Sequence, residues 1–467
     1  MLLLVSMLAI PSVTAPREAQ AASRPPNVLL IMSDDQSYDT LGVMPAVQEL
    51  QAEGTTFTRY YDSFPLCCPT RAAVLSGQYS HNNGVWDNTG RQGGYGALAE
   101  KNNTLARWLH DAGYRTAILG KLLNKYSMDT YGVPKGWDLF RVPQTAVYSY
   151  TKTVIRDESG NLTAYPGYRT DVYAQLAVDM LDQLGTTQPW FFWLAPNAPH
   201  TGNPVDPDDD PGVRSCSPSD VWRDHDQLAA LPPTPAYNEE DVSDKPRHIR
   251  RLPPLTLEQQ AAIHEAYTQQ LECLRSLDTY VATVLAHLAA TGQLANTDII
   301  YVSDNGYAYG EHRVPRGKKL PYDYAAHLPL VAAGPDFPRA VDSSLRSSVD
   351  LTATILDVTG ATPGHVVDGK SLLTPPDPYR AVLHEGRVVG SNSFNSHIRR
   401  YRGLRTQGWL YVHYYYQDGA EDYELYNTTD VPDQLTSLAA DPRYRTIRGY
   451  FERWLANIDH CSGSECP

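Results

Sequence analysis

The sequence lacks any apolar run long enough to cross a membrane, and it lacks a basic excess. The apolar run at its start, residues 1–10, is far shorter than the roughly 20 residues of a membrane-spanning helix. Lys and Arg number 39 against 53 Asp and Glu, so the formal net charge is -14. Nucleic-acid binding depends on a surplus of cations, and this balance therefore argues against nucleic acid as a partner. A few local cations can still dominate a pocket for an anionic substrate.

The sequence also lacks a CxxC pair, which argues against a metal site built from thiolates. In an exported protein the default for its six cysteines is disulfide formation. Two pairings are open for four of them, Cys461 with Cys466 and Cys216 with Cys273. The remaining two, Cys67 and Cys68, are adjacent, and the short ring of a bond between them would strain the peptide. They are left without an evident structural role.

The first 22 residues have the character of a secretory signal peptide. The apolar run 1–10 is followed by Ala19-Gln20-Ala21, which fits an A-x-A cleavage pattern. No Lys or Arg precedes the apolar run, which departs from the usual pattern, and a buried strand or a disordered tail is the alternative. We expect a secreted protein, extracellular, periplasmic or lysosomal according to its source, with no stable membrane insertion.

Four apolar runs are each followed by polar residues. They are Asn27–Met32, Thr116–Leu119, Trp190–Ala195 and Asp298–Val302. Helical periodicity lies between them, notably over Leu105–Ala112 and Leu257–Ala290. Continuous apolar runs are typical of strands buried on both faces, and their alternation with helices predicts a mostly parallel α/β sheet.

The polar residues after these runs form a candidate site, because ligands bind beyond the carboxyl ends of strands in open α/β sheets. We expect the following side chains to converge on one crevice: Asp34, Asp35, Lys121, His200, Asp304 and Asn305. Each of these motifs alone is more often a turn or a helix cap than a ligand set. Their joint position is what favours a site.

Two regions differ from this pattern. Residues 201–254 are rich in Pro and Asp, and their length predicts a surface excursion near the site. From about residue 375 onward, Tyr411–Tyr416 and Tyr423–Tyr426 predict strands of a small antiparallel sheet, and Tyr444–Ile458 predicts a closing helix. We therefore expect a catalytic domain over 23–375 and a C-terminal subdomain over 376–467.

The two unpaired cysteines stand at a predicted helix start. Pro69 suits the first turn of a helix and Gly77 suits its end. The helix dipole and free amides at such a start favour negative charge, and Arg71 adds a cation one turn along. Two small buried hydrophobic residues beside a helix start are the alternative interpretation of the cysteines.

This segment resembles a known family. Cys67-Cys68-Pro69-Thr70-Arg71 is similar to the C-x-P-S-R signature of sulfatases, and Leu75-Ser76-Gly77 to the L-T-G that follows it. In that family a dedicated maturation enzyme oxidises the first cysteine to formylglycine, and by position this is Cys67. Thr70 departs from the usual Ser but keeps a hydroxyl, so we expect maturation to survive.

Further motifs in the family's order extend the resemblance over most of the chain. They are Pro26-Asn27-Val28, Asp34-Asp35-Gln36, Gly120-Lys121, Ala198-Pro199-His200, Ser303-Asp304-Asn305-Gly306, Gly310-Glu311-His312-Arg313, Gly317-Lys318, and Glu424-Leu425-Tyr426 with Asp433. The double cysteine and the blocks 120–124 and 237–246 resemble N-acetylglucosamine-6-sulfatases and related bacterial arylsulfatases. The resemblance implies an alkaline-phosphatase-like fold: a mixed, mostly parallel central sheet flanked by helices, with a smaller C-terminal antiparallel sheet plus helix.

The resemblance also implies a cation site. Its ligands would be Asp34, Asp35, Asp304 and Asn305, completed by Cys67 as formylglycine. Oxygen ligands favour calcium or magnesium over zinc, and the family implies Ca2+ rather than Mg2+.

The implied mechanism is hydrolysis of a sulfate ester through a covalent sulfo-enzyme intermediate on the formylglycine of Cys67. Arg71 and Lys121 would hold the formylglycine oxygens. Lys318 and His200 would hold sulfate and assist the leaving group, with Lys121 also near the substrate. His312 is a further candidate for the substrate pocket.

The substrate stays open at this point. An aryl sulfate, an N-acetylglucosamine 6-sulfate type of sugar, or another glycosaminoglycan unit would fit. Ala308-Tyr309 and Asp323–His327 depart from the family's usual residues and bear on the substrate. The alternatives in function are a phosphonate monoester or phosphodiester hydrolase of the same superfamily, and a non-catalytic glycan-binding relative in which Cys67 stays a thiol.

Overall fold

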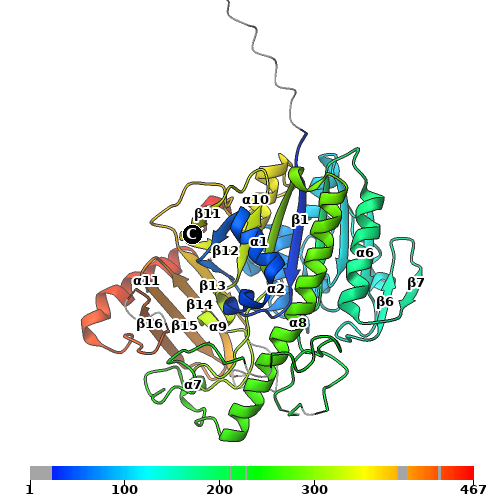
Figure 1. The fold of residues 1–467 in the computed structure, drawn as a ribbon. Helices are drawn as coiled ribbons and strands as arrows, with labels where there is room; N and C mark the ends of the chain where they lie inside the picture. Colours follow the sequence, from blue (N-terminus) through cyan, green and yellow to red (C-terminus); the bar gives the residue numbers. More distant parts are fainter. Residues whose placement is uncertain (1–23, 208, 211, 227–228, 388–396, 430–432) are drawn as a thin grey trace, which may run out of the picture.

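Two sheets organise the chain, and Figure 1 shows them side by side. The computed structural model describes residues 24–467 apart from 208, 211, 227–228, 388–396 and 430–432. The predicted signal peptide, 1–22, lies outside the described residues. No helix of the described part is both long and apolar enough to cross a membrane.

The large sheet has ten strands in the order β11-β2-β10-β9-β1-β8-β4-β5-β6-β7. Its centre is parallel, while β10 on one side and β6 and β7 on the other run antiparallel to their neighbours. The strands are β1 (Asn27–Ser33), β2 (Thr55–Phe57), β4 (Arg115–Gly120), β5 (Leu139–Pro143), β6 (Thr153–Arg156), β7 (Leu162–Tyr165), β8 (Trp190–Ala195), β9 (Thr297–Ser303), β10 (Leu330–Ala333) and β11 (Ala340–Asp342). The predicted mixed, mostly parallel sheet is confirmed.

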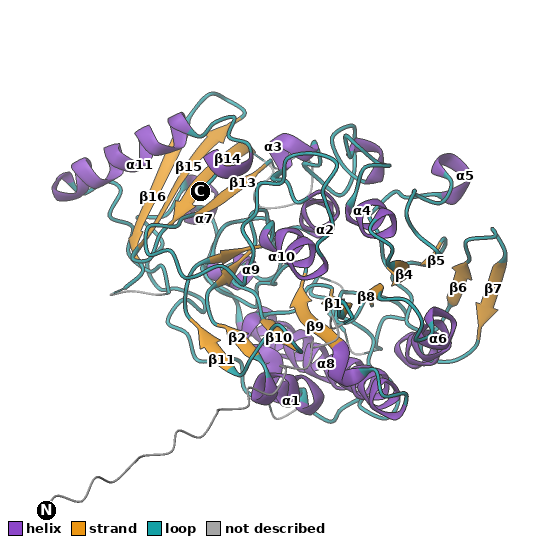
Figure 2. Cartoon of the chain, turned by 90° about the horizontal axis from the view of Figure 1, so that it is seen from above, coloured by secondary structure: helices purple, strands orange, loops and turns teal. Residues whose placement is uncertain are grey.

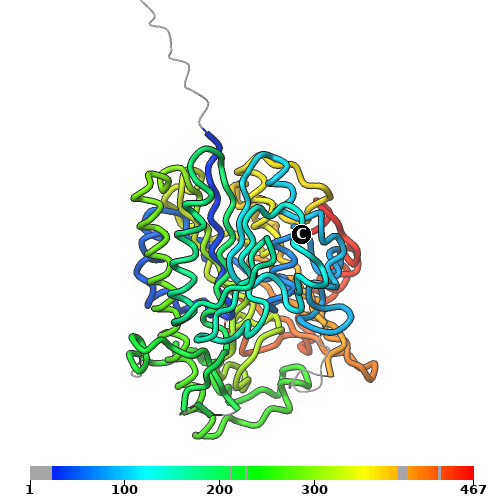
Figure 3. Tube along the Cα trace, turned by 90° about the vertical axis from the view of Figure 1, so that its right-hand side faces the viewer, coloured from blue at the N-terminus to red at the C-terminus, as the bar shows by residue number. Residues whose placement is uncertain are grey.

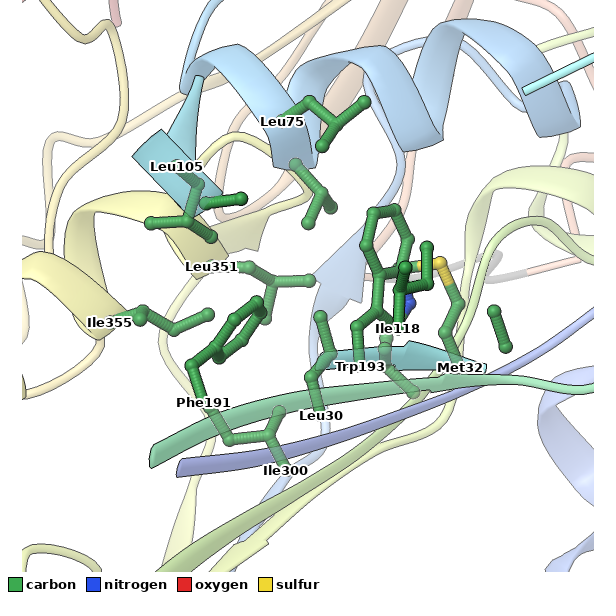
Figure 4. Close-up of a cluster of buried hydrophobic side chains, with 14 of the residues drawn as sticks. Leu30, Met32, Leu75, Leu105, Ile118, Phe191, Trp193, Ile300, Leu351 and Ile355 are labelled. Atoms are coloured by element: carbon green, nitrogen blue, oxygen red, sulfur yellow. The ribbon is translucent and has the colours of Figure 1, made fainter. Parts of the chain in front are cut away.

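The four apolar runs form four adjacent strands, β9, β1, β8 and β4. Along β1, Val28, Leu30 and Met32 pack into the core on one face, and Leu29 and Ile31 pack into the core on the other. Both faces of this central strand are covered, so residues 28–32 are all apolar. Figure 4 shows the first of these cores, with Leu30 and Met32 among its labelled side chains.

Helices cover both faces of the large sheet. Figure 2 shows α1, α6 and α8 on one side and α2, α4 and α10 on the other. The helices are α1 (Pro45–Glu53), α2 (Cys67–Ser76), α3 (Ser80–Asn83), α4 (Leu105–Asp111), α5 (Met128–Tyr131), α6 (Arg169–Leu184), α7 (Arg247–Arg250), α8 (Leu257–Ala290), α9 (Asp323–Ala326), α10 (Asp350–Thr359) and α11 (Arg445–Asn457). A capping box between Thr256 and Gln259 starts α8, which confirms the predicted helix from residue 257.

The C-terminal region forms the second, antiparallel sheet. Its strands pair in sequence order: β13 (Val382–Gly386), β14 (Ile398–Arg405), β15 (Trp409–Tyr416) and β16 (Glu421–Asn427). Phe451 and Leu455 of α11 pack on it through a core that also holds Tyr411 and Leu425. The same core includes Ala73 of α2. The antiparallel sheet therefore packs against the helix that begins with the adjacent cysteines Cys67 and Cys68. A short pair, β3 (Tyr60–Tyr61) and β12 (Arg346–Ser347), lies apart from both sheets.

The segment between β8 and α8 is the predicted excursion. Within its described part it contains one short helix, α7, and Figure 3 shows it in green beyond the core, at the end toward which β1 runs. Cys216 bonds to Cys273 and thereby ties the excursion to α8, while Cys461 bonds to Cys466 near the C-terminus. These are the two pairings that the sequence left open, and Cys67 and Cys68 are free and buried.

Candidate active site

The paired carboxylates lie together because β1 and β9 are parallel neighbours in register. Ser33 pairs with Ser303, so Asp34 and Asp304 follow side by side at the same edge. The backbone amide of Asp304 donates to the carbonyl of Ser33 at 3.1 Å. Asn305 donates from Nδ2 to Asp35 Oδ1 at 2.7 Å. The sequence expectation that these two strand ends converge is met.

The turn after β4 brings Lys121 to the same edge. Gly120 pairs with Ala195 of β8, and the Lys121 amide donates to the Ala195 carbonyl at 2.8 Å. Gly120 has φ 108°, and a Cβ there would lie 2.1 Å from the Ala195 oxygen. Only glycine allows this turn. The Lys121 ammonium bonds Asp34 as a result.

His200 reaches the same cluster from the turn after β8. Its Nε2 lies 3.6 Å from Asp35 Oδ2. Its Nδ1 lies 2.8 Å from the carbonyl oxygen of Thr201, and an N–H at Nδ1 would donate to that oxygen. The other ring nitrogen, Nε2, is the one that faces the cluster.

Cys67 is the first residue of α2 and points into the cluster. Its thiol lies 3.4 Å from Asp34 Oδ1, and Lys318 Nζ donates to its sulfur at 2.8 Å. Burial raises the pKa of the thiol, although Lys121 and Lys318 act in the opposite direction. The unmodified cysteine is therefore a protonated, buried group among charged neighbours.

Two buried cations, Arg71 and Lys121, offset the carboxylates. Arg71 donates from Nε to Asp304 Oδ2 at 2.7 Å, and from Nη1 to the Lys121 carbonyl at 2.8 Å. Burial alone would raise the pKa of Asp34, but Lys121, His200 and Arg71 together lower it to about 2. Asp34 is thus held ionised although it is fully buried.

The oxygen donors fit a divalent cation. Potential ligand atoms of Asp34, Asp35, Cys67 and His200 all lie within 4.8 Å of one another. The Lys318 ammonium contacts Asp35 Oδ1, and it lies 3.3 Å from Asn305 Oδ1. A positive group therefore already sits among these oxygens, which are the hard ligands that Ca2+ and Mg2+ prefer.

Arg71 provides a second test, namely whether the site suits a formylglycine at position 67. Its Nη2 is buried and has no hydrogen-bond partner among the described residues. The guanidinium belongs to the same helix as Cys67, one turn along. An additional oxygen at position 67, which formylglycine would carry, suits such a donor.

Cys68 and Thr70, the neighbours of Cys67 in the sequence, have structural positions. Cys68 packs into the hydrophobic core that includes Ala72 and Leu75. The Thr70 hydroxyl donates to Asp62 Oδ2 at 2.6 Å, and Asp62 is fully buried. Successive helical residues point about 100° apart, which is why only one cysteine faces the charged cluster.

His312 lies apart from the cluster. Its Nδ1 is 2.6 Å from Glu239 Oε2, and its ring packs against Tyr322 at a centroid distance of 4.5 Å. It has positive φ, 50°, as does Arg313 at 64°. This turn separates its ring from Lys318, which follows six residues later. The structure brings together Cys67 and the other predicted site residues, but not His312.

Tyr148 is a site residue that the sequence patterns miss. It lies in the loop between β5 and β6 and stacks on His200, with ring centroids 4.3 Å apart. The Lys121 ammonium lies 5.2 Å from the same ring, and Asn124 donates to the Tyr148 hydroxyl at 3.0 Å. A single aromatic residue in a loop has no periodicity or motif that could have identified it.

This mostly parallel sheet, with carboxylates, lysines and a helix-start cysteine at its carboxyl edge, defines an alkaline-phosphatase-like ester hydrolase. The chain belongs to the sulfatase family, because the model of that family matches residues 26–361. It is therefore a sulfuric ester hydrolase. The family described as N-sulphoglucosamine sulphohydrolase, C-terminal, matches residues 310–460.

Two curated relatives cover nearly the whole chain. An arylsulfatase of Volvox carteri is 30% identical, over 96% of this chain and 76% of its own length. The human N-acetylglucosamine-6-sulfatase is 29% identical, over 96% of this chain and 86% of its own length.

Two solved structures share the fold. One, in complex with its substrate D-glucosamine-2-N,6-O-disulfate, has a TM-score of 0.72 at 21% identity and covers 93% of this chain and 98% of its own. The other, the phosphonate monoester hydrolase of Agrobacterium radiobacter, has a TM-score of 0.71 at 20% identity and covers 94% and 96%. At these identities the likeness concerns the fold alone.

Proposed function

We propose that the chain hydrolyses sulfate esters of aryl alcohols or sugars through a formylglycine formed from Cys67. The observation that carries the proposal is the position of Cys67. Its sulfur begins a helix, lies 2.8 Å from Lys318 Nζ, and faces the buried carboxylates that end β1. A nucleophilic oxygen at this position would meet cations on one side and metal ligands on the other.

A calcium ion would be held by Asp34, Asp35, Asp304 and Asn305. When bound, it would act as a Lewis acid toward the formylglycine and the sulfate oxygens. The formylglycine would supply a nucleophile that forms and then releases a covalent ester, so that one difficult step becomes two. The pairing of Asp304 with Arg71 keeps this carboxylate oriented toward the centre.

The remaining residues bind the charge of the substrate and supply a proton. Lys318 and His200 have side chains 12% and 18% exposed, whereas those of Lys121, Asp34 and Asp35 are 5% exposed or less. The sulfate group therefore reaches the centre past Lys318 and His200, and the Lys318 ammonium and the His200 ring would bind its oxygens. An imidazolium at His200 would donate from Nδ1 to Thr201 and would carry a second proton on Nε2 for the departing alcohol.

Export and maturation complete the proposal. The disulfides Cys216–Cys273 and Cys461–Cys466 support an oxidising compartment. The predicted signal peptide agrees with export. A formylglycine-generating enzyme is the partner that the chain requires, and it would act on the segment around Cys67 before folding buries it.

A mass measurement tests the modification. Trypsin releases the peptide Tyr60–Arg71, which contains both free cysteines. Conversion of one thiol to an aldehyde lowers its mass by about 18 Da, and fragment ions place the change at Cys67 or Cys68. We expect the loss at Cys67 when the chain is made with the maturation enzyme. An unchanged peptide from such a host would contradict the proposal and favour a non-catalytic, glycan-binding role.

The rival activity is hydrolysis of phosphonate monoesters or phosphodiesters by the same fold. We expect kcat/KM for an aryl sulfate to exceed that for the matched aryl phosphonate and phosphodiester by at least about tenfold. All three esters carry one negative charge, so the difference would reflect stronger stabilisation of the transition state for sulfate transfer. Measuring all three esters on one matured preparation decides between the activities. Faster cleavage of either phosphorus ester would overturn the sulfatase assignment.

Tyr148 should position His200 during the proton transfer. Replacing Tyr148 with Ala removes the stacked ring, and we expect kcat to fall about tenfold for esters of poorly acidic alcohols. Esters of acidic phenols need less protonation and should lose much less. Tyr148→Phe keeps the ring and is the matched control. Equal losses for both classes of ester, or equal losses in the two variants, would show that Tyr148 does not act through His200.

A further inference from the structure

A cavity of about 290 Å³ lies beside the reaction centre. Its walls come from segments far apart in the sequence: 37–40 after β1, 232–236 of the excursion, Tyr267 of α8, 307–312 after β9, 323–327 around α9, and 433–434. Tyr307 and Tyr309 form part of its wall and also line the small hollow that reaches Asp35. The cavity therefore adjoins the centre through these two tyrosines.

The cavity is acidic. Four carboxylates line it, namely Asp39, Glu311, Asp323 and Asp433, and none of the described lining residues is Lys or Arg. Asp323 is paired with Arg405, but Asp39 and Glu311 have no ion pair with a described residue. Burial raises the pKa of Glu311 to about 7, and burial also raises that of Asp39. Both shifts reflect the lack of a compensating cation.

The histidines of the cavity do not supply positive charge. Burial lowers the pKa of His327 to about 4 and also lowers that of His312. His312 is only 2% exposed, and it uses Nδ1 toward Glu239. A neutral imidazole of this kind offers a polar atom to a ligand without attracting an anion.

Tyrosine rings complete the lining. Tyr38 stacks on His327 with centroids 3.7 Å apart, and the rings of Tyr307 and Tyr309 stand 5.6 Å apart on the side nearer Asp35. Aromatic rings with a few convergent polar groups are typical of small-molecule sites, and the volume suits one ring of a substrate. Carboxylates accept hydrogen bonds from hydroxyl and amino groups, which a sugar carries on every side.

We propose that this cavity binds the sugar ring that carries the sulfate ester and selects a ring with no second anionic group. The inference rests on the proposed sulfatase function. A neutral or amino sugar gains hydrogen bonds or ion pairs with Asp39 and Glu311, whereas a second sulfate meets carboxylates in a site of low dielectric. Arg214 and Arg316 line the hollow beside Asp35 and not this cavity.

Three sugars that share a 6-O-sulfate test the selection: glucosamine 6-sulfate, its N-acetyl form and its N-sulfo form. Calorimetric titration of the Cys67→Ala protein measures binding without turnover. We expect the N-sulfo sugar to bind at least about tenfold more weakly than the N-acetyl sugar, and the free amine to bind at least as tightly as the N-acetyl sugar. Equal or tighter binding of the N-sulfo sugar, or no binding of any of the three, would overturn the assignment.

Variants that remove the negative charges test whether Asp39 and Glu311 cause the preference for the N-acetyl over the N-sulfo sugar. In Cys67→Ala protein that also carries Asp39→Asn and Glu311→Gln, we expect the preference for N-acetyl over N-sulfo sugar to shrink from about tenfold to about twofold. Asp182→Asn is the matched control, because Asp182 is 63% exposed beside His287 at the end of α6, and it should leave the preference intact. An unchanged preference in the Asp39 and Glu311 variant would also overturn the assignment. A separate aryl sulfate assay on matured enzyme tests the sulfatase function itself, so the two failures are distinguishable.

Discussion

Replacing Cys67 with alanine should abolish sulfate release, with a loss in kcat/KM of about 10⁴-fold or more on an aryl sulfate. The variant cannot form formylglycine, and no other described side chain at the carboxyl edge of β1 offers a comparable nucleophile. The fold should survive, because the substitution removes one buried sulfur atom and costs about 1 kcal/mol of unfolding free energy. Sulfate release measured beside a thermal unfolding curve checks both statements.

The adjacent cysteine is the matched control. Cys68→Ala removes the same atom from the same turn of α2, but from the side that packs into the hydrophobic core. We expect it to be matured at Cys67 and to keep activity within a few-fold of the parent, at a similar cost in stability. Retained activity in Cys67→Ala, or an equal loss in Cys68→Ala, would contradict the assignment of the nucleophile.

Serine at position 67 separates the two halves of the reaction. Cys67→Ser offers a single hydroxyl, which can accept sulfate but has no second hydroxyl to expel it. We expect at most one alcohol released per enzyme molecule, followed by arrest, with sulfate retained on the peptide. Steady turnover by this variant would mean that water attacks the sulfated enzyme directly.

The sequence predicts those parts of the fold that depend on local pattern. The runs that became β1, β4, β8 and β9 are continuous and apolar because they are buried on both faces, and helix α8 begins at a capping box. Polar residues after a buried strand must lie at its carboxyl edge. The meeting of Asp34 with Asp304 therefore follows from strand order, once the two strands are neighbours.

The rest of the site depends on contacts between distant segments. Tyr148 stands on a loop and meets His200 only because the turn after β8 comes back toward it. His312 lies six residues before Lys318, yet positive φ angles at His312 and Arg313 place its ring against Glu239. No local pattern in the sequence specifies either arrangement. The acidic cavity is a stronger case, since its lining comes from six separate segments of the chain.

Calcium should stabilise the protein through the cluster that ends β1 and β9. We expect a chelator to remove activity and lower the melting temperature, and calcium to restore both. When the free calcium concentration is about 100 times the dissociation constant, binding adds about 2.7 kcal/mol to the free energy of unfolding. Oxygen ligands make zinc a poor substitute. A thermal unfolding series against calcium concentration gives the affinity without reference to turnover.

Asp35→Asn tests which residues hold the ion. Asp35 accepts from Asn305 and contacts Lys318, so its loss removes one negative charge from the ligand set and leaves an ammonium with one fewer partner. We expect calcium affinity to fall at least about tenfold, with little remaining shift in the melting temperature. Asp129→Asn makes the same chemical change at a side chain 76% exposed on α5, and should leave the calcium shift intact.

Two results would refute this cation site. The first is a parent protein whose melting temperature does not respond to calcium after thorough chelation. The second is an Asp35→Asn protein that keeps the full calcium shift, because a remote site would then bind the ion. Removal of the metal should also leave the secondary structure in place, since the carboxylates remain paired with Arg71, Lys121 and Lys318. The cation is thus expected to complete a site that the fold has already assembled.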